Sequence, residues 1–271
     1  MKYKQILNVL LLLLTILFVS CSNSENDKNM SIENKAVFLH HSTGNNIWKG
    51  GVSKYTYKIF KEGDVQKIIK KYNKVNKTDF SVIERVFPTK DAYGWKNYPF
   101  DYYNIWVKHA GDKPYMEEPT LEILTKEYGV IIWKHCFPVS AILEDTGNPD
   151  IDSEEKRLEN YKLQYDALKK KMHEFPNTKF ILWTGAALVN NATTEDNAKR
   201  MKEFVDWVNN EWNEKDDNIY IWNFYDLETE GGLYLKDEYA VNNKDSHPNK
   251  DFSAKAAKLF ADRIIEVFSS K

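Results

Sequence analysis

Five short apolar runs recur along the chain, and polar or turn-forming residues flank each of them. The runs are four to eight residues long or only slightly longer, and they are rich in β-branched and aromatic residues, which is typical of strands. The sequence therefore predicts five strands, at residues 35–40, 79–87, 130–134, 179–184 and 218–224.

Between these runs the apolar residues are spaced three and four apart, the period of an amphipathic helix. Pro119 suits the first turn of one helix, Asp152 or Ser153 can cap another, and Thr193 or Thr194 can cap a third. A shorter helix is expected within the aromatic-rich stretch after the second strand. We expect helices at 65–75, 101–109, 118–128, from about 153 to Pro176, from about 194 to Trp212, and at 252–268.

The strand and helix patterns alternate along the chain. Such alternation is typical of an α/β fold in which one parallel sheet carries helices on both faces. No internal repeat or linker divides the sequence after residue 31. We therefore expect one α/β domain over residues 32–271, built on a five-stranded parallel sheet.

The N-terminal segment has a different character. Two lysines precede a run of apolar residues, and Cys21 follows Ser20. This order resembles a bacterial lipoprotein signal, in which the signal is removed and the cysteine is lipidated. We expect a signal peptide at 1–20, lipidation of Cys21 and a polar tether at 21–31. The protein would then be anchored by lipid in the bacterial cell envelope. The alternative is an uncleaved membrane anchor, for which the apolar run is short.

Composition limits the classes of partner. Apolar residues make up 42% and charged residues 29% of the chain, as in an ordinary globular protein. The formal net charge is −2 and no block of basic residues stands out, so nucleic acid is not an expected partner. If Cys21 is lipidated, Cys136 is the remaining thiol, and an internal disulfide is excluded.

Residues with chemical potential follow the predicted strands. Ser42 comes after the first strand, the run Lys134-His135-Cys136 ends the third, Thr184 ends the fourth, and His247 lies in the loop after the fifth. Ligands of doubly wound sheets bind at the carboxyl ends of the strands, where these residues would converge.

These residues favour nucleophilic catalysis. A serine needs a base to become a nucleophile, and a histidine needs an acid to hold its tautomer, which assigns these roles to Ser42, His247 and Asp245. Cys136 is a weaker candidate, because its apolar surroundings are typical of an inert thiol. His40 and His41 are adjacent on a strand and would point to opposite faces, so we expect no metal and no organic cofactor.

Two motifs resemble those of a known family. Ser42 lies in FLHHSTGNN and His247 lies in DSHPN. The chain resembles a divergent branch of the SGNH, or GDSL-type, serine hydrolases, in which HHS replaces GDS. The resemblance implies a three-layer, flavodoxin-like sandwich and ester hydrolysis through an acyl-enzyme intermediate. It also assigns Ser42 as nucleophile and His247 as base.

The chain departs from the family at three places. Lys244 occupies the usual position of the acid, so that Asp245 lies two residues before the histidine, and His41 precedes the serine. KHCFP replaces the Gly-x-Asn-Asp block that supplies oxyanion donors in the family. Lys134, with Gly44 and Asn45 in the turn after Ser42, is then the candidate for oxyanion or substrate binding.

Two functions remain open. The first is a lipid-anchored esterase, for which an acylated carbohydrate is the favoured substrate because rings between Tyr93 and Trp106 would suit the wall of a sugar cleft. The second is a non-catalytic envelope lipoprotein of the same fold that binds a glycan or a protein partner, which the missing oxyanion block favours.

Overall fold

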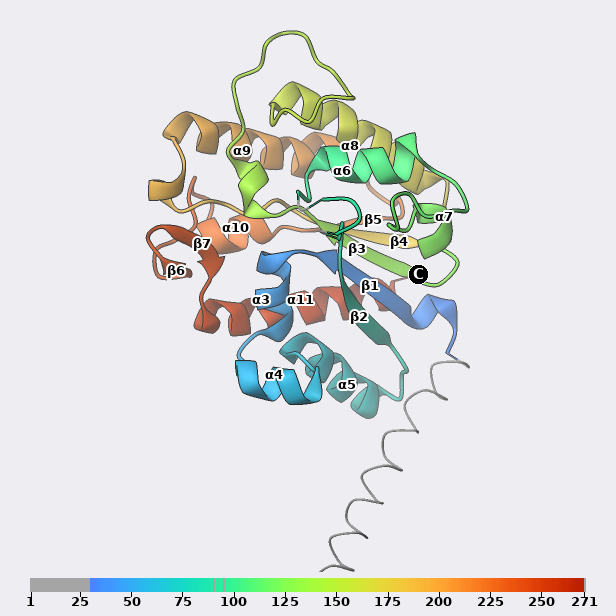
Figure 1. Cartoon of the computed structure of the whole chain (residues 1–271). Helices are drawn as coiled ribbons and strands as arrows, with labels where there is room; N and C mark the ends of the chain where they lie inside the picture. The colour runs from blue at the N-terminus through green and yellow to red at the C-terminus, as the bar shows by residue number, and fades with distance from the viewer. Residues whose placement is uncertain (1–29, 90, 95, 271) are drawn as a thin grey trace, which may run out of the picture. The chain divides into compact units, whose positions relative to one another are not determined.

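The sheet of the protein is parallel throughout and has the strand order β2-β1-β3-β4-β5 (Figure 1). This is a computed structural model, and it describes residues 30–89, 91–94 and 96–270. The predicted signal peptide, Cys21 and most of the tether lie outside the described residues. The five strands are β1 Lys35–His40, β2 Ser81–Val86, β3 Val130–Lys134, β4 Lys179–Trp183 and β5 Ile219–Trp222.

Alternate residues of the central strands face two separate cores, as the two-residue period of a strand requires. Leu39, Trp133 and Leu182 face one core. Their neighbours Phe38, Ile132 and Ile181 face the other. Both faces of the sheet are therefore buried, which explains the nearly continuous apolar runs of β1, β3 and β4 in the sequence.

Helices cover both faces (Figure 1). One face carries α6 Pro99–Tyr103, α8 Leu158–His173 and α9 Glu195–Trp207, and the other carries α3 Ser42–Lys49, α5 Asp64–Asn76 and α11 Lys250–Ser269. The predicted α/β class, a five-stranded parallel sheet within a three-layer flavodoxin-like sandwich, is confirmed. Residues Glu33–Lys271 form one compact unit.

The remaining elements are short. They are η1 Ile32–Asn34, α4 Lys54–Phe60, the π-helical η2 Asn104–Lys108, α7 Leu121–Leu124, η3 Phe137–Ser140, η4 Asn190–Ala192, the π-helical η5 Val208–Trp212, α10 Phe224–Thr229 and the antiparallel pair β6 Ala240–Asn242 and β7 Asp245–Pro248. Among the described residues, no helix has both the length and the apolar character needed to cross a bilayer.

Four helix predictions need correction. The helix expected from about 194 to Trp212 divides into α9 and the π-helical η5. The helix expected at 118–128 is limited to α7, because Glu118 pairs with Tyr115 in a tight turn and its carboxylate accepts hydrogen bonds from Thr89. The helix expected at 101–109 divides into α6 and the π-helical η2. The helix expected to begin near Ser153 begins at Leu158, because a hydrogen bond from Leu143 N to Lys156 O holds the preceding segment as a loop.

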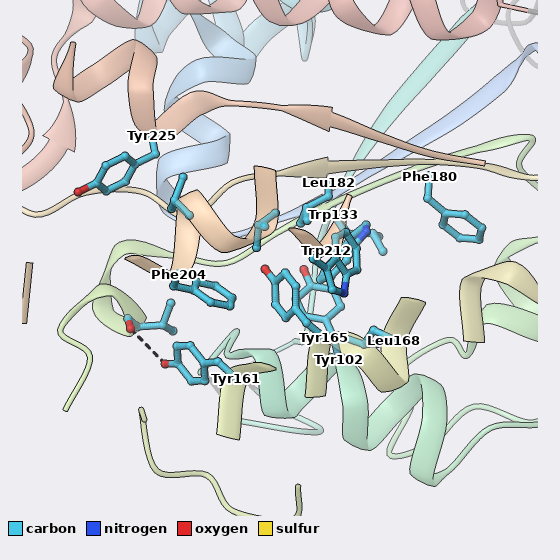
Figure 2. Close-up of a cluster of buried hydrophobic side chains, with 14 of the residues drawn as sticks. Tyr102, Trp133, Tyr161, Tyr165, Leu168, Phe180, Leu182, Phe204, Trp212 and Tyr225 are labelled. Carbon is cyan, nitrogen blue, oxygen red and sulfur yellow. Dashed lines mark hydrogen bonds between the residues drawn. The ribbon is translucent and has the colours of Figure 1, made fainter. Parts of the chain in front are cut away.

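Figure 2 shows the core beneath α8, where aromatic rings from several elements pack together. Tyr102 and Trp133 lie with ring centroids 5.0 Å apart, and Tyr161 donates a hydrogen bond to the Val139 carbonyl at 3.1 Å. Tyr102 and Trp106 are fully buried, and Phe100 and Tyr103 are buried too. These four rings do not line a sugar cleft, and that interpretation of the aromatic stretch was wrong for them: they pack in the interior.

Candidate active site

Ser42 is the first residue of α3 and directly follows the end of β1. The first turn of a helix has backbone N–H groups without intrahelical partners, and the helix dipole makes this end positive. Ser42 is half-buried and lines a hollow of about 440 Å³ together with His40, Asn45 and Glu84. The serine hydroxyl is therefore placed at the carboxyl edge of the sheet, at a site suited to negative charge.

His247 and Asp245 lie on the short strand β7, just before α11. Oδ1 of Asp245 accepts a hydrogen bond from the His247 ring at Nδ1, at 2.6 Å, and another from the His247 backbone N–H at 3.0 Å. Burial raises the pKa of Asp245, but these two hydrogen bonds outweigh it and hold the pKa below its usual value. The carboxylate thus fixes the imidazole with Nδ1 as donor, in spite of the short two-residue spacing.

The segment after β3 connects the two halves of the site. Cys136 Sγ lies 3.6 Å from Ser42 Oγ. The next residue, Phe137, packs edge-on against the His247 ring at 4.8 Å between centroids. In addition, α3 packs against β7. The structure therefore brings Ser42, Cys136, Phe137, His247 and Asp245 into one neighbourhood.

Ser42 and His247 are not hydrogen-bonded to each other in the described part of the chain, where Ser42 Oγ instead faces the sulfur of Cys136. Catalytic hydrogen bonds are often long or absent before substrate binds, so this geometry does not exclude the pair. It does mean that the serine must leave Cys136 before it can be deprotonated by His247.

The two histidines beside Ser42 are held by other partners. His40 Nε2 lies 2.7 Å from Glu84, and its Nδ1 lies 2.8 Å from the His41 carbonyl. His41 Nε2 donates to the carbonyl of Pro88 at 2.8 Å. Burial, reinforced by Lys134 and His40, lowers the pKa of His41 to about 4 in spite of this bond. Of the histidines near Ser42, His247 is therefore the best suited to act as a base.

Lys134 ends β3 with no exposed surface. Its Nζ has no hydrogen-bond partner among the described residues and lies 5.4 Å from the centre of the Trp183 ring. Burial lowers the pKa of Lys134, and nearby Cys136 and Glu228 oppose that shift. In this conformation Lys134 does not reach the hollow beside Ser42, so any effect on a substrate acts through its electric field.

The charge of Lys134 affects the pKa of Cys136. Burial raises the pKa of its thiol, but Lys134, together with hydrogen bonds from Ser42 and Thr43, outweighs burial and lowers the pKa. The sequence interpretation of Cys136 as an inert apolar thiol missed this setting. The signal in the sequence was the charged residue Lys134 two positions earlier, at the end of β3.

Gly44 and Asn45 occupy the first turn of α3. A Cβ at Gly44 would lie 2.4 Å from the Cβ of His40, so glycine allows the helix to approach β1. The backbone N–H of Asn45 already donates to the His41 carbonyl at 3.0 Å, as part of the helix. Of Asn45, it is therefore the side chain, which lines the hollow, that can contact a ligand.

The sequence did not identify two further residues of this region. Phe137 packs on the catalytic candidate His247. Glu228 of α10 is fully buried, accepts a hydrogen bond from the Ala187 N–H, and faces the charge of Lys134. Burial raises the pKa of Glu228 well above its usual value, against the opposing effects of Ala187 and Lys134. A glutamate in a short helix after a strand carries no signal of such burial.

Within the described residues, the group that could hold a metal ion comprises His173, Glu214 and Asp217, away from this site. Lys169 lies 2.7 Å from Glu214 and supplies a positive charge there, which disfavours a cation. No family model, curated protein or solved structure matches the chain.

Proposed function

We propose that the protein is a serine esterase in which Ser42 is the nucleophile, His247 the general base and Asp245 the residue that orients the base. The observation that carries the proposal is the 2.6 Å hydrogen bond between Asp245 and the His247 ring, on a strand that packs against the helix bearing Ser42. Serine, imidazole and carboxylate are the three groups that this chemistry requires.

In the proposed reaction, Ser42 Oγ leaves Cys136 Sγ and attacks the ester carbonyl while His247 Nε2 takes its proton. Asp245 holds the Nδ1 proton and stabilises the imidazolium that forms. The N–H groups of the first turn of α3 stabilise the oxyanion, and Lys134 adds a positive potential when it is protonated. His247 then protonates the leaving alcohol, and water hydrolyses the acyl-serine in the same way.

We also propose where the protein is located in the cell. The lipoprotein-like start of the chain supports lipidation at Cys21 and a place in the bacterial envelope. Acylated carbohydrate remains the proposed substrate class, but only the envelope location supports it. The rings of the aromatic stretch that are buried in the interior do not support a sugar cleft. A small-molecule ester fits the hollow of about 440 Å³ equally well.

A second candidate is a binding protein without catalysis. The contact between Ser42 Oγ and Cys136 Sγ favours it, because that contact engages the hydroxyl away from His247. In this reading the hollow beside Ser42 would hold a glycan or a segment of a protein partner.

Turnover of a short-chain aryl ester separates the two candidates. If the protein is an esterase, Ser42→Ala should abolish turnover above background. The control variant Ser153→Ala, distant in sequence from Ser42, should leave turnover unchanged. Equal turnover by wild type and Ser42→Ala would exclude Ser42-dependent hydrolysis of that ester and would favour the binding protein.

A further inference from the structure

Helix α4 exposes its apolar side chains. Tyr55, Ile59 and Phe60 are 83%, 73% and 69% exposed, and none of the seven residues of α4 is buried. Single exposed apolar residues are common on protein surfaces, but three large ones on two turns of helix form a patch. In Figure 1, α4 (light blue) lies below α3 and next to α5, at the bottom of the domain.

The helix itself is well defined. Ser53 caps its start and accepts a hydrogen bond from the Thr56 N–H at 3.1 Å. Tyr57 fastens it to the sheet by donating a hydrogen bond to Glu84 of β2. Tyr55 and Ile59 are four residues apart and share one side of the helix, whereas Lys54 and Lys58 share another. The apolar side of this amphipathic helix therefore faces water.

Positive charge gathers beside this patch. A hollow of about 530 Å³ lies between α3, α4 and the start of α11, and no acidic residue lines it. None of its lysines forms an ion pair within the described part of the chain. The lysines that line it are Lys49, Lys54, Lys58, Lys61 and Lys250.

The acids that follow α4 in sequence are already engaged, and Asp251, next to Lys250, does not line the hollow. Glu62 pairs with Lys70, and Asp64 lies 3.8 Å from Lys67 and accepts a hydrogen bond from the Gly51 N–H. Lys49 lies over the Tyr57 ring at 4.5 Å from its centre. A chain with a formal net charge of −2 thus concentrates five lysines around one hollow that no acidic residue lines.

We infer that α4 and the lysines of this hollow dock on a lipid surface that carries anionic headgroups. The lysines alone would suit any polyanion, but a soluble polyanion would leave Tyr55, Ile59 and Phe60 in water. A lipid surface satisfies both features, because the apolar side enters the headgroup boundary while the ammonium groups meet phosphates. The inference does not depend on catalysis by Ser42.

Docking would orient the candidate active site. Pro248 and Lys250 line the hollow, and they follow His247 directly in the chain. Strand β7, which carries His247, would then lie near the lipid, so that esters at the membrane surface come within reach of His247.

Hydrogen exchange of the full chain on vesicles tests the inference. Amides of 54–61 should exchange about tenfold more slowly on vesicles of phosphatidylcholine mixed with phosphatidylglycerol than on phosphatidylcholine alone. Residues 1–29 include Lys2, Lys4 and Lys28 and are the same in wild type and in the α4 variant, so the difference between these two proteins reports on α4. The joint substitution Lys54→Gln, Lys58→Gln and Lys61→Gln should remove the protection.

A matched variant controls for net charge. Lys113→Gln, Lys170→Gln and Lys215→Gln change three exposed lysines elsewhere and should leave the protection intact. The inference is overturned if α4 exchanges equally on both lipids, or if the control variant loses protection as fully as the α4 variant. Equal protection by dextran sulfate without vesicles would also overturn it, and would identify a soluble polyanion as the ligand.

Discussion

At the scale of single residues, the strongest feature of the site is the double hydrogen bond from His247 to Asp245. It places a carboxylate on Nδ1 and leaves Nε2 to face a substrate or Ser42. Other polar groups near Ser42 have partners of their own, such as the pair formed by His40 and Glu84, whereas Lys134 Nζ has no hydrogen-bond partner among the described residues.

Asp245→Asn tests the orienting role. An amide no longer favours the tautomer with a proton on Nδ1, so kcat/KM for an aryl ester should fall by about 10²- to 10⁴-fold. Asp217→Asn is the matched control, since Asp217 contacts His173 at 3.0 Å outside the site. Equal activity of Asp245→Asn and wild type would contradict a role for Asp245 in catalysis.

His41 makes stability depend on pH. Its pKa is lowered to about 4 in the folded protein, chiefly by burial, whereas the unfolded chain keeps the usual value of about 6.5. The unfolded state therefore binds the proton first as pH falls, and stability is complete above pH 6.5 and is lost between pH 6.5 and 4. At pH 5 the loss from this residue should be about 2 kcal/mol.

Urea unfolding at pH 7 and pH 5 measures this loss. His41→Gln cannot take up the proton, so its free energy of unfolding should fall less between the two pH values than that of wild type, by about the same 2 kcal/mol. An identical fall in both proteins would show that His41 does not titrate as its burial implies.

At the scale of elements, α3 depends on a close approach between Gly44 and β1. Gly44→Ala would place a Cβ 2.4 Å from the Cβ of His40, so the helix must shift, and the free energy of unfolding should fall by about 1–3 kcal/mol. Gly51→Ala is the control, because its nearest contact would be 3.3 Å. Urea denaturation gives both values, and equal stability of the two variants would contradict the close approach.

Strands β1, β3 and β4 could be predicted from sequence because burial on both faces makes them almost continuously apolar. The long helices α5 and α11 and the Thr194 cap of α9, which accepts from Asn197 N at 3.2 Å, followed from period and capping. Helix α4 escaped prediction because its seven residues are too few to show a clear helical period.

The site was harder to predict than the fold. The order of strands brings Ser42, Cys136 and His247 to one edge, and a parallel α/β pattern predicts that convergence. The partners that tune each group depend on tertiary contacts. The burial of Lys134 and Glu228, and the contact of Ser42 with Cys136, arise from packing between segments more than 40 residues apart, where sequence spacing carries no information.

At the scale of the whole molecule, the two cores share the same strands, since neighbouring residues of β3 and β4 face opposite sides. Loss of one core therefore removes support from the other, and the domain should unfold in one transition. Ile132→Ala and Leu182→Ala, one in each core, should each lower the free energy of unfolding by about 2–5 kcal/mol.

In each variant, the urea transition measured by circular dichroism should coincide with the transition measured by tryptophan fluorescence. Leu259→Ala, at a side chain that is 39% exposed, is the control and should change stability little. Two separated transitions, with only one affected by Ile132→Ala, would contradict a shared sheet that couples the cores.

The measurement that tests the central claim most directly is labelling by a fluorophosphonate probe, with the modified residue located by peptide mass spectrometry. Our account predicts an adduct on Ser42, formed about 100-fold more slowly in His247→Ala because the base is lost, and at the wild-type rate in His173→Ala. Absence of an adduct on Ser42, or an equal rate of labelling in His247→Ala, would contradict the account.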